Sequence, residues 1–564
     1  KLVNVVEEMS IASGVPVPAI YILEEDLAIN AFVAGFNSTN TLLCMTKGAV
    51  DQLSRDELQG VIAHEFSHIL NGDMRTNMTL MAALAGIQSI SQVGSSILRM
   101  NRYSRHRKNS GGLMMLGFGL SFVGFVGVFF GRLIRSAISR QREFLADASA
   151  VQFTRNPEGI AGALYKISQN HSNNHLVSSH TEDLSHLCFS QAQSFRFERL
   201  FATHPDIEER ISAVHPNFSP QKMIPASLNE KLKSDVNTKS STRETPYTQK
   251  WHHGYELHHG HEIMSGFSSS LSIPSPPSIP SPSIPKIPLK TIPEKSSGRI
   301  FKQSVGQVTP EQIEYAEHFL NMLPPSFLDN CHTPITGKSI LYFLLSHEYK
   351  KDPKDISSWL LKHEGTEFNH HFNKLSAELK NYTDKYRFPL LQMAMAPIKA
   401  FSNTDKIQWL SNIEQFITLD GKVSLFEMLI SLVMKKTLST QKPLESIGHI
   451  KSLKPVLADI DYVLHLVLMV SGYQGDDLLK VKNTLFSRCK GDYACQTQAN
   501  LSSKALYKAM VRLAHLNPLL KQTVLELLMD AVEHDQKITL NEADLIRTIG
   551  WLLECPIPPL SVTE

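Results

Sequence analysis

The sequence has few cysteines and almost no excess of either charge. Its six cysteines are scattered over 564 residues, and only Cys489 and Cys495 lie close together. This spacing is not that of a disulfide framework and is typical of a reducing compartment. Lysine and arginine number 56 against 54 aspartates and glutamates, which gives a formal net charge of +2 at pH 7. We therefore expect no nucleic-acid partner, because no excess of positive charge would attract a polyanion.

The chain also lacks an initiating methionine. It begins at Lys1, and the residues that follow already have a helical pattern. We expect the natural N-terminus, with any signal or anchor that it carried, to lie upstream. A chain of 564 residues is too long for one hydrophobic core, so we expect at least two domains.

Composition divides the chain into three regions. Up to residue 217, apolar-periodic runs alternate with short turns, whereas residues 218–300 are rich in serine, proline and histidine. The middle stretch cannot bury enough apolar surface to offset its chain entropy, so we expect a disordered linker there. Helical periodicity returns in residues 301–564 and predicts a C-terminal all-α domain.

The N-terminal region contains signals for a small sheet and one well-bounded helix. Ala19–Leu23 and Thr41–Thr46 have the composition of strands. Ser54 and Glu57 form a capping-box pattern that predicts a helix start, and Gly72 supplies a plausible stop. Apolar residues recur at helical spacing between these two points.

Two hydrophobic segments, residues 78–98 and 113–134, raise the question of a membrane. The stretch from Leu113 to Gly131 carries no charge and approaches the ~20 apolar residues that span a bilayer. Its alternative is a buried core helix, and we favour a span. Residues 78–98 are uncharged but hold glutamines and serines, so a second span, an interfacial helix and a soluble helix all stay open. Basic residues lie on both sides of the second segment, so the positive-inside rule does not settle the orientation.

His64-Glu65-Phe66-Ser67-His68 lies within the predicted helix. Histidines four residues apart project from one helical face and can bind one metal ion with an open coordination position, as catalytic zinc requires. Glu65 would lie beside the metal, where it can take a proton from the bound water and pass it to a leaving amine. The alternative is a surface helix with two unrelated histidines, but the apolar flanks and the bounded helix favour the metal site.

Zinc needs a third protein ligand, for which Glu143 and Asp147 are the best candidates. They are again four residues apart and directly follow the hydrophobic run, so both carboxylates share a helical face. One could bind the metal while the other orients a histidine through its free ring nitrogen. An ordinary charged helix is the alternative that spacing alone leaves open.

These motifs resemble those of the HtpX-like zinc metalloproteases, which are related to the CAAX-prenyl endopeptidases. The resemblance covers about residues 1–215 and rests on Asn30-Ala31-Phe32, His64 to Asp73, Arg142 to Asp147, Thr203-His204-Pro205 and Glu209-Arg210-Ile211. It implies one catalytic Zn²⁺ held by His64, His68 and Glu143, with Glu65 as the base.

The same resemblance implies roles for further residues. Asp147, His204, Arg210 and Asn71 match family positions that orient the ligands or stabilise the tetrahedral intermediate. For His204 a simple turn at a helix start is the alternative. Asn30, Ala31 and Phe32 lead into the Thr41 strand, which we expect to be a sheet edge that either binds substrate as an added strand or is an ordinary edge.

The resemblance further implies a multi-pass protein of the cell inner membrane, with the protease domain facing the cytoplasm. The implied partners are the lipid bilayer and polypeptide substrates, in particular damaged or misfolded membrane proteins. The predicted fold is mainly α: a zincin-type (gluzincin) domain with a small β-sheet and a transmembrane helix or hairpin, followed by the C-terminal all-α domain.

The C-terminal region contains an internal repeat. Asp420 to Glu427 and Asp535 to Glu542 match at their acidic, basic, hydroxyl, leucine and glutamate positions. An EF-hand is excluded because the alternating oxygen ligands are missing. Each copy instead predicts a tight turn and a capping box between two helices. The region resembles TerB-like helical domains, which implies a protein partner or regulation near membranes rather than catalysis.

The leading hypothesis is therefore a membrane-anchored zinc endopeptidase in the quality control of membrane proteins. One alternative is a specific processing protease for membrane or lipidated precursors. Another is a non-proteolytic membrane scaffold that acts through the helical domain, although a decayed site has no chemical need for Glu65.

Overall fold

The computed structural model is mainly helical, and its described part holds one small sheet. The described residues are 1–103, 110–169, 189, 204–218, 308–348, 353–379, 382, 384–399, 401–438, 450–487, 495 and 502–562. The predicted linker lies outside these residues except for Phe218, as do residues 104–109 between the two hydrophobic segments. The mainly α fold class with a small sheet is confirmed.

The sheet has three strands: β1 (Ala19–Leu23), β2 (Ala31–Asn37) and β3 (Asn40–Thr46). Their order is β1-β3-β2, with β1 parallel and β2 antiparallel to β3. The two predicted strands are confirmed as β1 and β3. The expectation that the Thr41 strand forms the edge is wrong, because β3 is the central strand and β2 lies at the edge. Alternation in a short sequence does not reveal which strand lies between the other two.

Helix α3 (Arg55–Leu70) carries the two motif histidines and begins and ends where the sequence predicts. Ser54 accepts from the amide of Glu57, and the Glu57 carboxylate accepts from the amide of Ser54, so two otherwise unpaired N–H groups are satisfied. Asn71 caps the C-terminal end, and Gly72 follows with a φ of 68°. The helix is buried along most of its length, which fixes the direction of its side chains.

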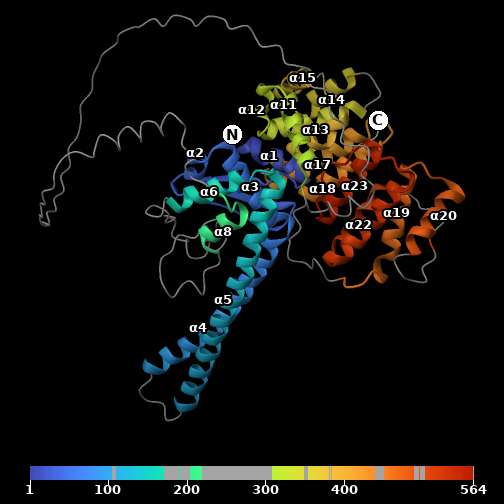
Figure 1. Ribbon diagram of the computed structural model, residues 1–564. Coiled ribbons are helices and arrows are strands. Elements are labelled where there is room, and N and C mark those ends of the chain that lie inside the picture. The colour runs from blue at the N-terminus through green and yellow to red at the C-terminus, as the bar shows by residue number, and fades with distance from the viewer. Residues whose placement is uncertain are drawn as a thin grey trace, which may run out of the picture. The chain divides into compact units, whose positions relative to one another are not determined.

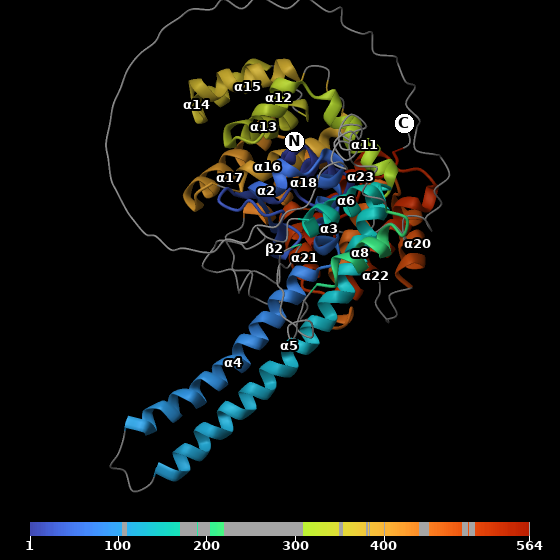
Figure 2. The same ribbon diagram turned by 60° about the vertical axis from the view of Figure 1, so that its left-hand side comes forward.

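Helices α4 (Asp73–Tyr103) and α5 (Ser110–Thr154) run side by side as a long hairpin (Figures 1 and 2). Both are long and apolar enough to cross a membrane. Small residues line their interface: a Cβ atom at Gly94 would lie 2.5 Å from the Ser121 amide, and one at Gly124 would lie 2.6 Å from the Ser91 Cβ. Close backbone approach through small residues is typical of packed membrane helices.

The outer face of the hairpin is apolar and uncovered. Phe118, Phe122 and Phe125 are 63%, 66% and 67% exposed. A core helix of a soluble protein would bury such side chains, because exposed aromatic area is costly in water. The structure therefore favours the spanning interpretation of residues 113–134 over a buried core helix.

Shorter helices surround α3. They are α1 (Leu2–Ser13), α2 (Lys47–Gln52), α6 (Pro157–Gln169) and α8 (Ile207–Val214). Helix α6 packs on α3, and α8 packs on both α5 and α6. The arrangement brings segments from both ends of the N-terminal region against the buried helix that holds the histidines.

The C-terminal region is entirely helical in its described part. Its helices are α11 (Pro310–Met322), α12 (Pro325–Asn330), α13 (Pro334–Glu348), α14 (Pro353–His363), α15 (Thr366–Glu378), η3 (Asp384–Tyr386), α16 (Arg387–Ile398), α17 (Asn403–Ile417), α18 (Leu425–Leu438), η4 (Lys454–Val456), α19 (Leu457–Val470), α20 (Gly475–Phe486), α21 (Ser503–Ala514), α22 (Pro518–Val532), η6 (Glu533–Asp535) and α23 (Leu540–Leu553).

The two copies of the internal repeat have the predicted local structure. At the start of α18, the amides of Ser424 and Glu427 each donate to the side chain of the other residue, and Thr539 and Glu542 do the same at the start of α23. Helices α18 and α23 also pack against each other. The repeat thus places two equivalent turns before two helices that share one core.

The described residues up to 218 and those from 308 onward form one compact unit. Helix α1 contacts α3 of the N-terminal region and also α11 and α16 of the C-terminal region. The Asn37 amide donates to Glu554 Oε1 at 3.0 Å, and one hydrophobic core combines side chains from both regions. The predicted domain boundaries at residues 217 and 300 stay predictions.

Gly14 allows the chain to turn where the C-terminal segment crosses it. It ends α1 with a φ of 75°, and a Cβ atom there would overlap the carbonyl oxygen of Ile557. Gly14→Ala should therefore lower the free energy of unfolding by more than the ~1 kcal/mol that a left-handed alanine costs. The loss is measured as a drop in the melting temperature of the detergent-solubilised chain. Gly472→Ala is the matched control, since Gly472 has a φ of 87° and open space around it. Equal shifts for the two variants would contradict this packing.

Candidate metal centre

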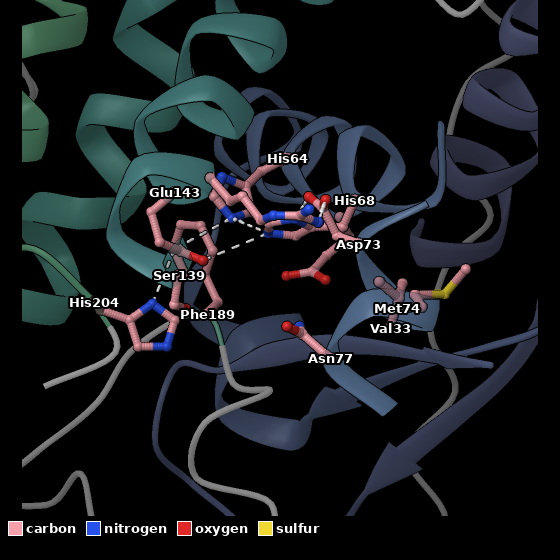
Figure 3. Close-up of a pocket in the computed structure, with 12 residues that line it drawn as sticks. Val33, His64, His68, Asp73, Met74, Asn77, Ser139, Glu143, Phe189 and His204 are labelled. Atoms are coloured by element: carbon pink, nitrogen blue, oxygen red, sulfur yellow. Dashed lines mark hydrogen bonds and ion pairs between the residues drawn. The ribbon is translucent and has the colours of Figure 1, made fainter. Parts of the chain in front are cut away.

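His64, His68 and Glu143 converge on one point, from α3 and α5 (Figure 3). The two Nε2 atoms lie 3.2 Å apart. Glu143 Oε2 lies 3.7 Å from Nε2 of His64, and Glu143 Oε1 lies 3.6 Å from Nε2 of His68. In a tetrahedral site with bonds of about 2.0–2.1 Å, nitrogen and oxygen donors lie about 3.4 Å apart. The three donors therefore fit a single metal ion with one position left open.

Two carboxylates fix the orientation of the histidine rings. His64 Nδ1 lies 2.9 Å from Asp147 Oδ1, and His68 Nδ1 lies 2.8 Å from Asp73 Oδ2. A carboxylate only accepts, so each Nδ1 carries the proton and each Nε2 presents a lone pair. Two lone pairs thus face each other at 3.2 Å beside a carboxylate. This arrangement is unfavourable without a cation, and it is the strongest physical argument for a metal.

The environment of His64 keeps its ring neutral. The side chain is buried, and burial lowers its pKa to about 4, although Asp147 and Glu143 act in the opposite direction. A neutral imidazole can donate its Nε2 lone pair to a metal, whereas an imidazolium cannot. His64 is therefore available as a ligand at neutral pH.

Glu65 lines the same pocket as these ligands, and its hydrogen-bond partner is the Val33 backbone. The pocket is lined by Val33, His64, Glu65, His68, Asp73, Met74, Asn77, Ser139, Arg142, Glu143, Phe189 and His204. Burial raises the pKa of Glu65 to about 7, although His68 and a hydrogen bond with the Val33 backbone favour the carboxylate. A carboxyl group whose pKa lies near neutrality can both accept and return a proton.

Arg210 holds the outer side of the cluster. It is buried on α8, and its Nε and Nη2 atoms donate to the two oxygens of Asp147 at 2.8 and 2.7 Å. Burial alone would lower the pKa of Arg210, but Asp147 and Glu143 together raise it above its usual value. The guanidinium therefore stays charged and fixes the carboxylate that orients His64.

Three further groups complete the wall of the site. His204 Nδ1 lies 2.9 Å from Glu143 Oε2. The ring of Phe189 meets that of His64 edge-on with centroids 4.8 Å apart, and its carbonyl accepts from Arg210 Nη1 at 3.0 Å. Arg142 pairs with the second oxygen of Asp73. Figure 3 shows His204 approaching Glu143 from the side opposite Asp73.

The predicted edge-strand residues do not line the pocket themselves. Ala31 and Phe32 lie on β2, and Asn30 directly precedes it. Phe32 packs beside Cys44, whereas its neighbour Val33 lines the pocket. The Ala31 carbonyl accepts a backbone hydrogen bond from the Phe189 amide at 2.7 Å, on the side of β2 that faces away from β3.

Asn71 is not brought to the cluster. It is an exposed helix cap whose amide donates to Ser67 Oγ at 3.0 Å, so this geometry does not support a role in catalysis.

Sequence reasoning missed two residues that act on the site. Asp73, which orients His68, starts α4 immediately after the turn that ends α3, and its only sequence signal was its place at the end of the histidine motif. Phe189 had no signal, because it is far from the other site residues in the sequence.

Comparison with known proteins agrees with this geometry. Residues 1–216 match the model of peptidase family M48. A "Protease HtpX homolog" of Dictyoglomus turgidum is 42% identical over 223 residues, which are 40% of this chain and 71% of that protein. The chain belongs to peptidase family M48. It is an HtpX-like metalloprotease.

Two further relatives share the name "Protease HtpX homolog" and cover the same part of the chain. The one from Thermoanaerobacter pseudethanolicus is 43% identical over 214 residues, 37% of this chain and 69% of its own length. The one from Streptococcus uberis is 38% identical over 216 residues, 37% of this chain and 70% of its own length. No solved structure matches the chain. Family M48 membership thus rests on the N-terminal region that contains the metal centre.

Asp73 should control metal affinity through His68. Asp73→Asn keeps the size of the side chain but removes the charge that fixes the Nδ1 proton, so metal affinity should fall about 10–100-fold. Competition with a chromophoric chelator measures this change. Asp51→Asn, at an exposed ion pair with Lys47, is the control and should leave affinity unaltered. Unchanged affinity in the Asp73 variant would show that this carboxylate does not position the ligand.

Proposed function

We propose that this M48 protein is a membrane-anchored, zinc-dependent endopeptidase whose ion is bound by His64, His68 and Glu143. The observation that carries the proposal is the convergence of the Glu143 carboxylate with two Nε2 lone pairs, whose rings are held by hydrogen bonds from Nδ1 to Asp147 and Asp73. Two imidazoles and one carboxylate are a donor set of catalytic zinc enzymes, with the fourth position open to water and substrate. The expected cofactor is one Zn²⁺ at this site.

Glu65 is the proposed general base. A bound zinc ion would polarise the substrate carbonyl and make a water molecule more acidic. Glu65 would take a proton from that water and transfer it to the leaving amine as the peptide bond breaks. The burial of Glu65 supports this role, because the surrounding apolar atoms disfavour a permanently charged carboxylate.

His204 and Arg210 have different proposed roles. Arg210 touches Asp147 and the Phe189 carbonyl, so it positions His64 indirectly. His204 lines the pocket, and among the described residues its Nε2 makes no hydrogen bond. From that position His204 could donate to the oxygen anion that forms when water adds to the peptide carbonyl.

Strand β2 is the proposed docking edge for the substrate backbone. The hydrogen bond from the Phe189 amide to the Ala31 carbonyl supports this, because a backbone donor beside the site already pairs with this edge. Adding a strand reads mainly backbone and so permits varied side chains. A protease that degrades damaged proteins needs this tolerance, and membrane proteins are the proposed substrates.

The α4–α5 hairpin is the proposed anchor. Helix α5 continues without a break from the apolar run into Glu143 and Asp147, so an apolar run that spans the membrane would hold the site close to the bilayer. This supports cleavage close to a bilayer surface. The proposed setting is the cell inner membrane, where the site faces the cytoplasm and the protein takes part in quality control. The helical region after residue 300 is proposed to bind a protein partner.

Glu65→Gln should abolish cleavage and retain zinc. The amide cannot accept the proton, whereas the three proposed ligands are unchanged, so turnover of an unfolded membrane protein in detergent should fall by about 10²-fold or more. Zinc content is measured in the same preparation. Glu158→Gln, on the exposed start of α6, is the matched control. Undiminished cleavage by the Glu65 variant would contradict the mechanism.

Lipid insertion should depend on the apolar face of α5. The chain reconstituted in vesicles should resist extraction at alkaline pH. Phe122→Lys with Phe125→Lys should make it extractable, because a central lysine costs about 2.5–3.5 kcal/mol on insertion scales. Phe122→Leu with Phe125→Leu keeps the face apolar and should leave the chain in the lipid. Release of the unmodified chain by the alkaline wash would argue against a spanning hairpin.

A further inference from the structure

A second group of metal-binding side chains lies far from the catalytic pocket, where the C-terminal region meets α1. Glu7 projects from α1, while Cys331 and His332 lie in the turn between α12 and α13. Glu7 and Cys331 are separated by 324 positions in the sequence. Their proximity therefore results from the tertiary fold, and no short sequence motif predicts it.

The donor atoms have the spacing of a coordination site. Cys331 Sγ lies 3.8 Å from Glu7 Oε1 and 3.6 Å from His332 Nδ1, and His332 Nδ1 lies 3.6 Å from Glu7 Oε1. Around tetrahedral zinc, sulfur lies about 3.6 Å from a nitrogen or oxygen donor, and nitrogen lies about 3.4 Å from oxygen. All three separations agree with these values to within a few tenths of an ångström.

Hydrogen bonds account for only part of this cluster: Cys331 Sγ donates to the Leu328 carbonyl at 3.2 Å and lies within sulfur hydrogen-bond distance of Glu7 Oε1 and of the His332 ring. A distance of 3.6 Å between His332 and Glu7 is too long for an N–H···O bond. Glu7 is only 2% exposed, and among the described residues its Oε2 atom has no hydrogen-bond partner. A buried carboxylate with a free oxygen is costly unless a cation or a proton neutralises it. A metal ion bound within the cluster would neutralise this carboxylate in place of a proton.

We propose that Glu7, Cys331 and His332 form a second zinc site that joins α1 to the turn between α12 and α13. Thiolate, imidazole and carboxylate are all zinc ligands, and the thiolate selects zinc over magnesium or calcium. His332 is exposed, so a water molecule could supply the fourth ligand. The ion takes the place of the Cys331 proton, which is released to solvent on binding.

The consequence is structural. Helix α1 belongs to the part of the chain that matches family M48, whereas Cys331 and His332 belong to the C-terminal helices. A metal ion bound by both stabilises their contact, because it binds only when the two regions are docked. This site is independent of the proposed catalytic function, since it shares no residue with the His64 cluster.

Cobalt substitution of the full chain distinguishes the two sites. The catalytic cluster contains no sulfur, so a cobalt–thiolate charge-transfer band in the near ultraviolet reports a site that includes cysteine. We expect this band in the unmodified chain and its loss in Cys331→Ser. Cys555→Ser is the matched control, since Cys555 lies away from the cluster and should leave the band intact.

Zinc content gives the second readout. The unmodified chain should hold one more zinc per chain than Cys331→Ser, Glu7→Gln or His332→Ala, and each variant should lose the zinc-dependent rise in melting temperature. His332→Ala matters most if the Cys331 variant fails to fold, because His332 is exposed. These variants should retain protease activity. The same zinc content in the His332 variant as in the unmodified chain, or a cobalt band that survives Cys331→Ser, would overturn the proposal.

Discussion

Two imidazole lone pairs face each other at 3.2 Å beside a carboxylate, and the rest of the catalytic region serves to hold them there. Asp147 and Asp73 each fix one ring by accepting its Nδ1 proton. Arg210 and Arg142 in turn fix those aspartates. Folding therefore desolvates the two imidazoles and the carboxylate and holds them close together without a metal ion. This preorganisation makes the metal centre rigid.

The second constraint is that one helix, α5, carries both an exposed apolar face and two carboxylates of the site. Helix α5 runs from an exposed apolar face at Phe122 to Glu143 and Asp147 without interruption. Any movement of α5 relative to α3 would alter the separation of Glu143 from the histidines. Small residues such as Gly94 and Gly124 let α4 and α5 approach closely, and α4 also supplies Asp73. Both helices of the hairpin thus contribute to the geometry of the metal centre.

The features that sequence could predict are those set by neighbouring residues. The capping box at Ser54 and Glu57, the helix that carries His64, and strands β1 and β3 follow from local hydrogen bonding and periodicity. The pairing of Glu143 with the histidines needed the family resemblance as well, because spacing alone also fits a charged surface helix.

The features that sequence could not predict depend on contacts between distant segments. The central place of β3 depends on how the three strands pair in space rather than on their order in the sequence. The position of Phe189 depends on its hydrogen bond to the edge of β2. The burial of Glu7 depends on helices that follow much later in the chain. Asp73 is the instructive case, because it lies within the motif yet acts only through the turn that directs it back to His68.

The most direct test is an anomalous difference map, calculated from crystals of the full chain with data collected at the zinc absorption edge. The account predicts a peak within bonding distance of His64 Nε2, His68 Nε2 and the Glu143 carboxylate, at about 2.0–2.2 Å from each donor. A zinc-loaded protein with no peak at that point would contradict it.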